Sequence, residues 1–214
     1  MFILTHNLKF PDVELADEDG LLAVGGDLSI EHLLIAYRNG IFPWYNEEEP
    51  IYWWCPNPRF VLFPEQLKIS SGMKKIINKN EFHFTIDKAF SEVIMNCKQI
   101  PRKNQEGTWI NNDIVHAYTQ LHELGKAQSA EAWFNEELVG GLYGVRLGNI
   151  FFGESMFTKK SHAGKFAFIN FVKQLQKENV ALIDCQVYTQ LLESLGAQMI
   201  PRKTFTQILK KNLS

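Results

Sequence analysis

Apolar side chains recur at helical spacing in several stretches of this chain. After Ser29, which can cap a helix, the apolar residues from Ile30 to Tyr37 fall on one helical face, and Gly40 is well placed to end the helix. The same spacing predicts three further helices in the middle of the chain: one around residues 73–77, one from a cap at Asp87 through Cys97, and one from a cap at Asn112 or Asp113 to Gly125. It predicts three more near the C-terminus: one over residues 163–178, one around residues 191–195 that ends at Gly196, and one that begins at a cap at Thr204.

Alternation of apolar and polar residues predicts strands in other stretches. Residues 82–86 alternate with period two, and so do residues 127–157, where Asn135-Glu136 and Gly148-Asn149 are turn signals. The longer stretch is therefore predicted to form a three-stranded antiparallel meander. Residues 180–187 are typical of a short buried strand. Antiparallel strands followed by helix, strand and helix indicate an α+β fold.

Residues 40–64 interrupt both patterns. They contain five prolines and three tryptophans, which exclude a regular helix and most strand interiors. We therefore predict an aromatic-rich loop surface, and we place a domain boundary near Pro64. This gives a small N-terminal domain over residues 1–63, which carries the loop, and a larger domain over residues 64–214.

Composition narrows the class of protein. The chain has 214 residues, is 45% apolar, has a formal net charge of −2 and a pI near 6.3. It can bury a sizeable core, and any nucleic-acid contact must be local, since the chain is not basic overall. Three separated cysteines suggest neither a disulfide framework nor a zinc site. With no signal-peptide core and no apolar run of membrane-spanning length, we expect a cytoplasmic protein without a membrane segment.

Familiar nucleotide, hydrolase and metal motifs are missing. Gly164-Lys165 is followed by Phe166 and lacks the upstream glycine of a phosphate-binding loop. Residues 153–157 match a nucleophile elbow at three positions only, without its final glycine. His122-Glu123 lacks the second histidine of a zincin. The sequence therefore implies no metal.

Polar residues in two predicted strands are the candidates for chemistry. Asp184 and Gln186 are two residues apart in the buried strand, so their side chains leave the same face. A buried aspartate needs a partner or a function, and a satisfied structural pair at a strand end would explain the same residues. Glu154 and Met156, on the neighbouring strand, are also expected to share one face. If the two strands pair, a carboxylate, an amide and an adaptable apolar floor come together. Taken alone, Glu154 is more typical of a solvated strand residue, and Met156 is more typical of the core.

Tryptophans and lysines suggest a second kind of site. Four tryptophans (44, 53, 54 and 109) lie in segments predicted to be loops, where they can serve as stacking platforms for single-stranded nucleic acid, although core packing of the small domain would also explain them. Local cations are available for phosphate contacts at Lys74, Lys75, Lys79, Arg102, Lys103, Lys159, Lys160 and Lys165. For each lysine, a solvated surface position is the simpler interpretation.

Eight sequence blocks identify a family. They are GLLAVGGDLS (20–29), GIFPWY (40–45), WWCPNPR (53–59), EGTWI (106–110), ELVGGLYGV (137–145), FFGESMF (151–157), LIDCQV (182–187) and SLGA (194–197). In content and order these blocks strongly resemble bacterial leucyl/phenylalanyl-tRNA–protein transferases. The resemblance covers nearly the whole chain from Gly20 to Arg202.

The resemblance implies a fold and a reaction. The larger domain would have the acetyltransferase-like (GNAT) fold, with a mixed, mostly antiparallel sheet. The α-amino group of a protein that begins with Arg or Lys would attack the ester carbonyl of Leu-tRNA or Phe-tRNA, which marks that protein for degradation. The ester is already activated, so positioning and modest proton handling supply much of the rate, and no cofactor is needed. The partners implied are aminoacyl-tRNA and the acceptor protein, and we expect a monomer.

Matching motifs carry the family's site residues onto this chain. Asp184 and Gln186 resemble the catalytic pair, in which the Gln186 amide oxygen accepts a proton from the attacking amine and Asp184 orients and polarises that amide. Trp44 and Trp109 resemble the residues that hold the 3′-terminal adenosine. The positions around the apolar aminoacyl side chain are Leu142, Met156, Phe168, Phe171 and Ile183.

Some features stay open at this point. Alternation points Ile183 away from Asp184, which fits poorly with a pocket position. Glu154 suits either the aminoacyl amine or the basic acceptor side chain. Leu191 stands where relatives have a histidine, and the chain ends soon after Arg202-Lys203, so roles of that histidine or of a longer tail cannot be transferred.

Two other functions compete with this interpretation. An acetyl-CoA-dependent N-acetyltransferase would use a related fold, but the R/Q-x-x-G-x-G/A signature for the CoA pyrophosphate is absent before residue 163. A non-enzymatic adaptor for protein N-termini or tRNA ends would bind without transfer, and would make the polar pair of Asp184 and Gln186 structural.

Overall fold

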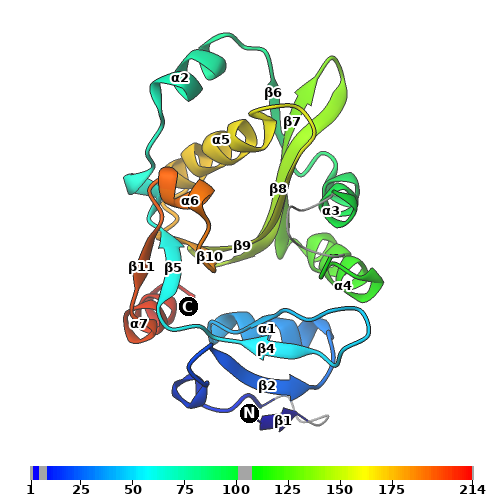
Figure 1. Cartoon of the computed structure of the whole chain (residues 1–214), viewed down its shortest axis with the longest axis vertical. Coiled ribbons are helices and arrows are strands. Elements are labelled where there is room, and N and C mark those ends of the chain that lie inside the picture. The colour runs from blue at the N-terminus through cyan, green and yellow to red at the C-terminus, as the bar shows by residue number, and fades with distance from the viewer. Residues whose placement is uncertain (1, 5–8, 101–107, 214) are drawn as a thin grey trace.

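The computed structural model describes residues 2–4, 9–100 and 108–213. In that part of the chain, seven strands form a large sheet in the order β11-β5-β10-β9-β8-β7-β6, and four form a small sheet in the order β1-β2-β4-β3. The small sheet and helix α1 lie at one end of the molecule, with the large sheet and its helices beside them (Figure 1).

The elements have the following bounds. The strands are β1 (Phe2–Leu4), β2 (Leu21–Gly25), β3 (Phe42–Pro43), β4 (Tyr52–Trp54), β5 (Arg59–Leu62), β6 (His83–Ile86), β7 (Ala127–Phe134), β8 (Glu137–Leu147), β9 (Ile150–Thr158), β10 (Leu182–Gln186) and β11 (Gln198–Ile200). The α-helices are α1 (Ile30–Arg38), α2 (Ser71–Asn78), α3 (Phe90–Gln99), α4 (Asn112–Glu123), α5 (Ala163–Lys177), α6 (Gln190–Ser194) and α7 (Arg202–Asn212). Two 3₁₀ helices cover Val13–Leu15 and Pro64–Gln66.

The α+β class and the mixed, mostly antiparallel sheet are confirmed. In the large sheet β9 and β10 are parallel, and the other neighbouring strands are antiparallel. The meander is formed by β7, β8 and β9 as expected. Asn135 and Glu136 both have positive φ, 50° and 65°, as a tight two-residue hairpin turn requires.

The proline-rich region contains short strands that its sequence pattern does not predict. Residues 40–64 include β3, β4 and β5, each of two to four residues. The strand β5 belongs to the large sheet, between β10 and β11, although it precedes Pro64. Residues from both sides of the expected boundary also pack in one core cluster, including Trp53, Phe152 and Phe205.

Three expected helix caps are wrong. Ala89, not Asp87, occupies the N-cap position of α3, and Asp87 instead accepts a hydrogen bond from the Ser129 backbone N–H at 2.7 Å. Asn111 caps α4 through the Ile114 N–H, in place of Asn112 or Asp113. The last helix begins at Arg202 behind Pro201, so Thr204 lies inside it. Ser29 caps α1 as expected, with its hydroxyl accepting from the His32 N–H.

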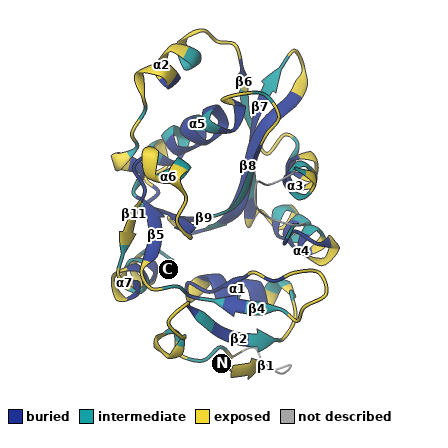
Figure 2. Ribbon diagram, viewed as in Figure 1, coloured by how far each residue is buried: buried dark blue, intermediate teal, exposed yellow. Residues whose placement is uncertain are grey.

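Helices cover both faces of the large sheet. The side chains of α5 pack with one face in a cluster that includes Phe151, Phe168 and Ile183, whereas α3 and α4 pack with the other face. Burial follows this arrangement: α5 and the central strands are buried, and α2, at the far end from the small sheet, is mostly exposed (Figure 2). None of the helices in the described ranges combines the length and apolar composition that a membrane span needs.

Candidate active site

The central opening in the large sheet lies where two parallel strands separate. The pairing of β10 with β9 covers three residue pairs and ends at Asp184 and Phe152, although β9 continues to Thr158. Beyond that point the backbones of the two strands no longer pair. A cavity of about 320 Å³ occupies this position.

The cavity combines an apolar floor with a polar wall. Its lining consists of Phe42, Pro43, Trp44, Trp109, Leu142, Tyr143, Phe151, Gly153, Glu154, Ser155, Met156, Phe168, Ile183, Asp184, Cys185, Gln186, Val187, Thr189, Leu191 and Leu192. Ligand sites are typically of this kind, concave and mostly apolar, with a few convergent polar groups.

Most of the expected site residues meet at this cavity. Asp184, Gln186, Glu154, Trp44, Trp109, Leu142, Met156, Phe168 and Ile183 all line it. Phe171 does not line it and instead packs behind Phe151, with ring centroids 4.8 Å apart. Leu191, the position that departs from the relatives, also lines the cavity.

The expected cations lie elsewhere. Lys74, Lys75 and Lys79 are exposed on or directly after α2, and none of them lines the cavity. Arg102 and Lys103, together with the start of the EGTWI block, fall outside the described residues. Of the tryptophans, Trp53 is fully buried against Phe10 and His32, so core packing explains it.

A β-bulge determines which way Glu154 points. In the pairing of β8 with β9, Tyr143 is opposite Ser155 and Gly144 is opposite Gly153, which leaves Glu154 as the extra residue. The bulge reverses the alternation of side chains. Met156 therefore packs with the core on the α5 side, whereas Glu154 bonds to Tyr37 and Tyr118 of the opposite core. The expectation that Glu154 and Met156 share one face is wrong.

Gln186 adopts a rare backbone conformation at the end of β10. Its φ is +61°, and the Val187 N–H donates to the Cys185 carbonyl at 2.7 Å, so Gln186 is the central residue of a γ-turn in the left-handed region. Such strain clusters at functional sites and persists only where neighbours enforce it. Asp184 does so here, since its Oδ1 accepts from the Gln186 backbone N–H at 2.9 Å.

Asp184 is itself fixed by a buried ion pair. Arg59 donates through Nε to Oδ1 at 2.8 Å and through Nη2 to Oδ2 at 2.7 Å, and both side chains are buried. The guanidinium carbon also lies 4.7 Å from the ring centroids of Phe42 and Phe205. Asp184 therefore holds Gln186 through a hydrogen bond to its backbone, whereas the Gln186 side-chain amide turns to another carboxyl.

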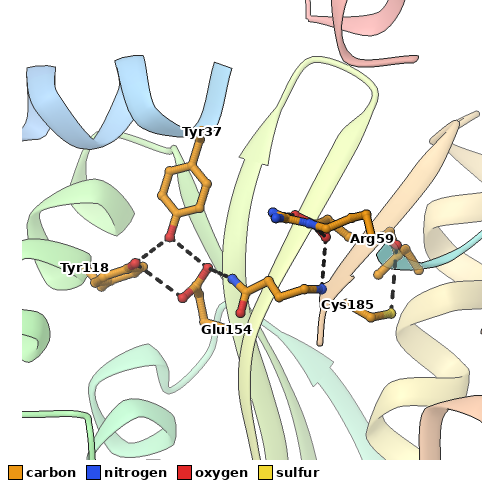
Figure 3. A network of polar contacts seen from close by, with 8 residues as sticks. Tyr37, Arg59, Tyr118, Glu154 and Cys185 are labelled. Atoms are coloured by element: carbon orange, nitrogen blue, oxygen red, sulfur yellow. Dashed lines mark hydrogen bonds and ion pairs between the residues drawn. The ribbon is translucent and has the colours of Figure 1, made fainter. Parts of the chain in front are cut away.

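The Gln186 amide contacts Glu154. Its Nε2 donates to Glu154 Oε1 at 2.9 Å, and the same carboxyl accepts from Tyr37 at 2.7 Å and from Tyr118 at 3.3 Å. Figure 3 shows the side chains of Tyr37 and Tyr118 converging on the Glu154 carboxyl. The two tyrosine hydroxyls also contact each other, and because each carries a single proton, two protons are shared among the three contacts that join Tyr37, Tyr118 and an ionised Glu154.

Burial raises the pKa of Glu154 to about 7, and the charge of Asp184 acts in the same direction. Hydrogen bonds from Tyr37, Tyr118 and Gln186 oppose this rise because they stabilise the carboxylate. The Glu154 carboxyl therefore changes its charge near neutral pH. Burial also raises the pKa of the Cys185 thiol, which stays protonated.

Three residues of this network do not stand out in the sequence. Tyr37 has the spacing of a core residue of α1, Tyr118 has the spacing of a core residue of α4, and Arg59 stands only as part of a family block. Their helical or strand positions indicate burial, and no local pattern signals the contact with Glu154 or Asp184.

Fold and cavity together define the class of protein. The α+β sheet opens where two parallel strands separate, and the apolar pocket there ends at an amide and a titratable carboxyl. These are the parts that an acyl-transfer enzyme requires.

Comparisons with known proteins give the family. Residues 61–210 match the family model described as leucyl/phenylalanyl-tRNA protein transferase, and residues 26–57 match the one described as its N-terminal domain. The chain belongs to this family. A relative from Flavobacterium johnsoniae named leucyl/phenylalanyl-tRNA–protein transferase is 56% identical over 98% of this chain and 99% of its own length. A relative of the same name from Syntrophobacter fumaroxidans is 53% identical over 100% of this chain and 91% of its own length.

A solved structure described as a GCN5-related N-acetyltransferase from Kribbella flavida is similar at lower identity. It shares 7% of residues, covers 79% of this chain, has a TM-score of 0.39, and is itself covered over 59% of its length. The family assignment rests on the sequence comparisons and not on this likeness.

Proposed function

We propose that this chain transfers leucine or phenylalanine from aminoacyl-tRNA to the α-amino group of proteins that begin with Arg or Lys, and thereby marks them for degradation. The observation that carries the proposal is the cavity, because its apolar floor ends at Glu154 and Gln186. Membership of the transferase family and the names of the two relatives support the same function.

The apolar floor suits a leucine or phenylalanine side chain. Leu142, Met156, Phe168 and Ile183 line it, and Phe171 supports it from behind through Phe151. Methionine is unbranched and repacks at low cost, so one pocket can accept both an aliphatic and an aromatic group. A charged side chain would lose its hydration there without gaining a partner on the floor.

Two tryptophans at the cavity suit the terminal adenosine of tRNA. Trp44 is 40% exposed and Trp109 is 6% exposed, and both line the cavity. Adenine stacks on aromatic rings without a need for a basic protein surface. With the adenosine held there, the ester carbonyl of the aminoacyl group would lie near Gln186.

Gln186 and Asp184 have different roles in this proposal. The Gln186 amide nitrogen is engaged by Glu154, which leaves the amide oxygen as an acceptor for the N–H of the attacking amine. Asp184 is a positioning residue, since it holds the Gln186 backbone and is paired with Arg59.

The protein works as a monomer without a cofactor, and the α2 lysines contact tRNA phosphates.

A transfer assay tests the proposal. Purified protein is incubated with radiolabelled Leu-tRNA, or with Asp-tRNA as a control donor, and with peptides that differ only in an N-terminal Arg or Ala. We expect label from Leu-tRNA in the Arg peptide only. Retention of Leu-tRNA without transfer to either peptide would favour an adaptor, and transfer from labelled acetyl-CoA instead would favour an N-acetyltransferase.

A further inference from the structure

The transfer reaction needs a group that takes a proton. When the amine nitrogen bonds to the ester carbonyl carbon, one N–H proton must leave before a stable amide forms. The Gln186 amide oxygen can orient the amine by accepting a hydrogen bond, but an amide is too weakly basic to hold the proton. A second group in the cavity must therefore receive it.

Two carboxyl groups line the described part of the cavity, and they are not equivalent. Both oxygens of Asp184 accept from Arg59, and Oδ1 also accepts from the Gln186 backbone. Protonation of Asp184 would leave the buried Arg59 charge uncompensated, which is costly. The Glu154 carboxyl accepts instead from neutral donors, which are the hydroxyls of Tyr37 and Tyr118 and the Gln186 amide.

We infer that Glu154 is the proton acceptor of the transfer step, and that Tyr37 and Tyr118 are positioning residues that set its protonation. This inference rests on the proposed function. The amine nitrogen bonds to the carbonyl carbon, and its proton passes to a Glu154 carboxylate oxygen. The bond from that carbon to the ribose oxygen then breaks, and Glu154 returns the proton to the ribose oxygen. One proton moves from nitrogen to oxygen overall, and nothing is oxidised or reduced.

The surroundings of Glu154 fit this role. The titratable and charged groups that face it are Tyr37 from α1, Tyr118 from α4, Asp184 from β10 and Arg59 from β5. Burial and the charge of Asp184 raise the pKa of Glu154, the hydroxyls lower it, and the balance near 7 matches a base that must both take and release a proton. Loss of either hydroxyl would raise that pKa further.

The test is the pH dependence of single-turnover transfer from Leu-tRNA to an Arg peptide across neutral pH. In the wild type we expect the transfer rate to fall toward low pH in two steps, which are the acidic limbs of the profile. One limb comes from protonation of Glu154 and the other from protonation of the peptide amine. Glu154→Gln is expected to lower the rate at slightly alkaline pH by about 10²- to 10⁴-fold and to leave only the amine limb. Tyr118→Phe is expected to move the Glu154 limb to higher pH.

Tyr188→Phe is the matched control. It removes a hydroxyl from an exposed tyrosine that donates to Glu193, and it should leave both limbs in place. A Glu154→Gln variant that keeps both limbs and changes only the KM for the peptide would overturn the inference, because Glu154 would then only bind the acceptor. Unchanged limbs in Tyr118→Phe would overturn the positioning role. Failure of the wild type to transfer at all would reject the proposed function itself.

Discussion

The Glu154 side chain carries a pH-dependent cost for folding. The ordinary pKa of a glutamate is 4.5 and that of Glu154 in the folded chain is about 7, so the folded state binds the proton more tightly than the unfolded state. Both states are protonated well below the ordinary pKa. As pH rises from 4.5 to about 7, the folded state loses stability relative to the unfolded state, and the full cost is present above pH 7.

We therefore predict that Glu154→Gln stabilises the protein at high pH. Each pKa unit corresponds to about 1.4 kcal/mol, so on going from acid to alkaline pH the variant should gain up to about 3 kcal/mol in free energy of unfolding relative to the wild type. Urea unfolding on either side of the Glu154 titration measures this difference. The exposed Glu48→Gln control should show no such gain, and a pH-independent difference for Glu154→Gln would contradict the prediction.

Single residues of the site were predictable to different degrees. Asp184 and Gln186 stand out because polar side chains in a buried strand need partners, whereas Glu154 draws notice only through the expected neighbouring strand and the family block. Their partners do not stand out, since Tyr37 lies 117 residues from Glu154 in the sequence and Arg59 lies 125 residues from Asp184. Helical spacing shows that a tyrosine is buried, but not which distant carboxyl its hydroxyl meets.

Among the elements, long periodic ones were predicted well and short ones were not. The helices α1 and α5 and the meander follow their patterns over eight or more residues. In residues 40–64 the strands are too short to show alternation, and prolines mask them. The bulge at Glu154 was not predictable from period two, because it is an extra residue that the pattern does not mark.

Helix α2 permits a test of tRNA binding that is independent of the cavity. Its lysines at 74 and 75, and Lys79 after it, are exposed, and α2 lies at the end of the molecule far from the small sheet (Figure 1). If they bind phosphates, replacement of all three by alanine should weaken aminoacyl-tRNA binding. A plot of the logarithm of the association constant against the logarithm of salt concentration should also become less steep, by about 0.7 for each phosphate that is no longer neutralised. Filter binding at several salt concentrations measures the slope.

The control for α2 is a matched set of lysines on α7. Lys203, Lys210 and Lys211 are also exposed, and their replacement by alanine removes the same total charge. An equal effect of both triple variants would indicate a general charge effect. An unchanged slope in the α2 variant would place α2 outside the tRNA interface.

At the scale of the whole molecule, the ion pair of Arg59 and Asp184 joins three parts of the chain. Arg59 belongs to β5, its guanidinium lies between Phe42 of the small sheet and Phe205 of α7, and Asp184 belongs to the central strand β10. The pair therefore connects the small sheet, the C-terminal helix and the cavity. A boundary near Pro64 divides the chain in sequence, whereas this ion pair and the shared core cross it.

We predict that Asp184→Asn lowers the free energy of unfolding by about 3–5 kcal/mol, because it leaves a buried guanidinium without its counter-charge. Tryptophan fluorescence and far-ultraviolet circular dichroism should follow the same urea transition, since one core includes both sheets. As a control, Glu178→Gln breaks the surface pair with Arg146 and should cost less than about 1 kcal/mol. Separate transitions by the two probes would show that the sheets unfold independently.

At the γ-turn of Gln186, selection for stability and selection for turnover favour different residues. Glycine is the residue that relieves a positive φ at the lowest cost, and it is also the residue that deletes the amide facing Glu154. Random mutation followed by selection for thermal resistance alone would favour the glycine codon here. Selection for turnover would remove it. The left-handed glutamine therefore marks a position where the chain combines a strained backbone with a side chain that contacts Glu154.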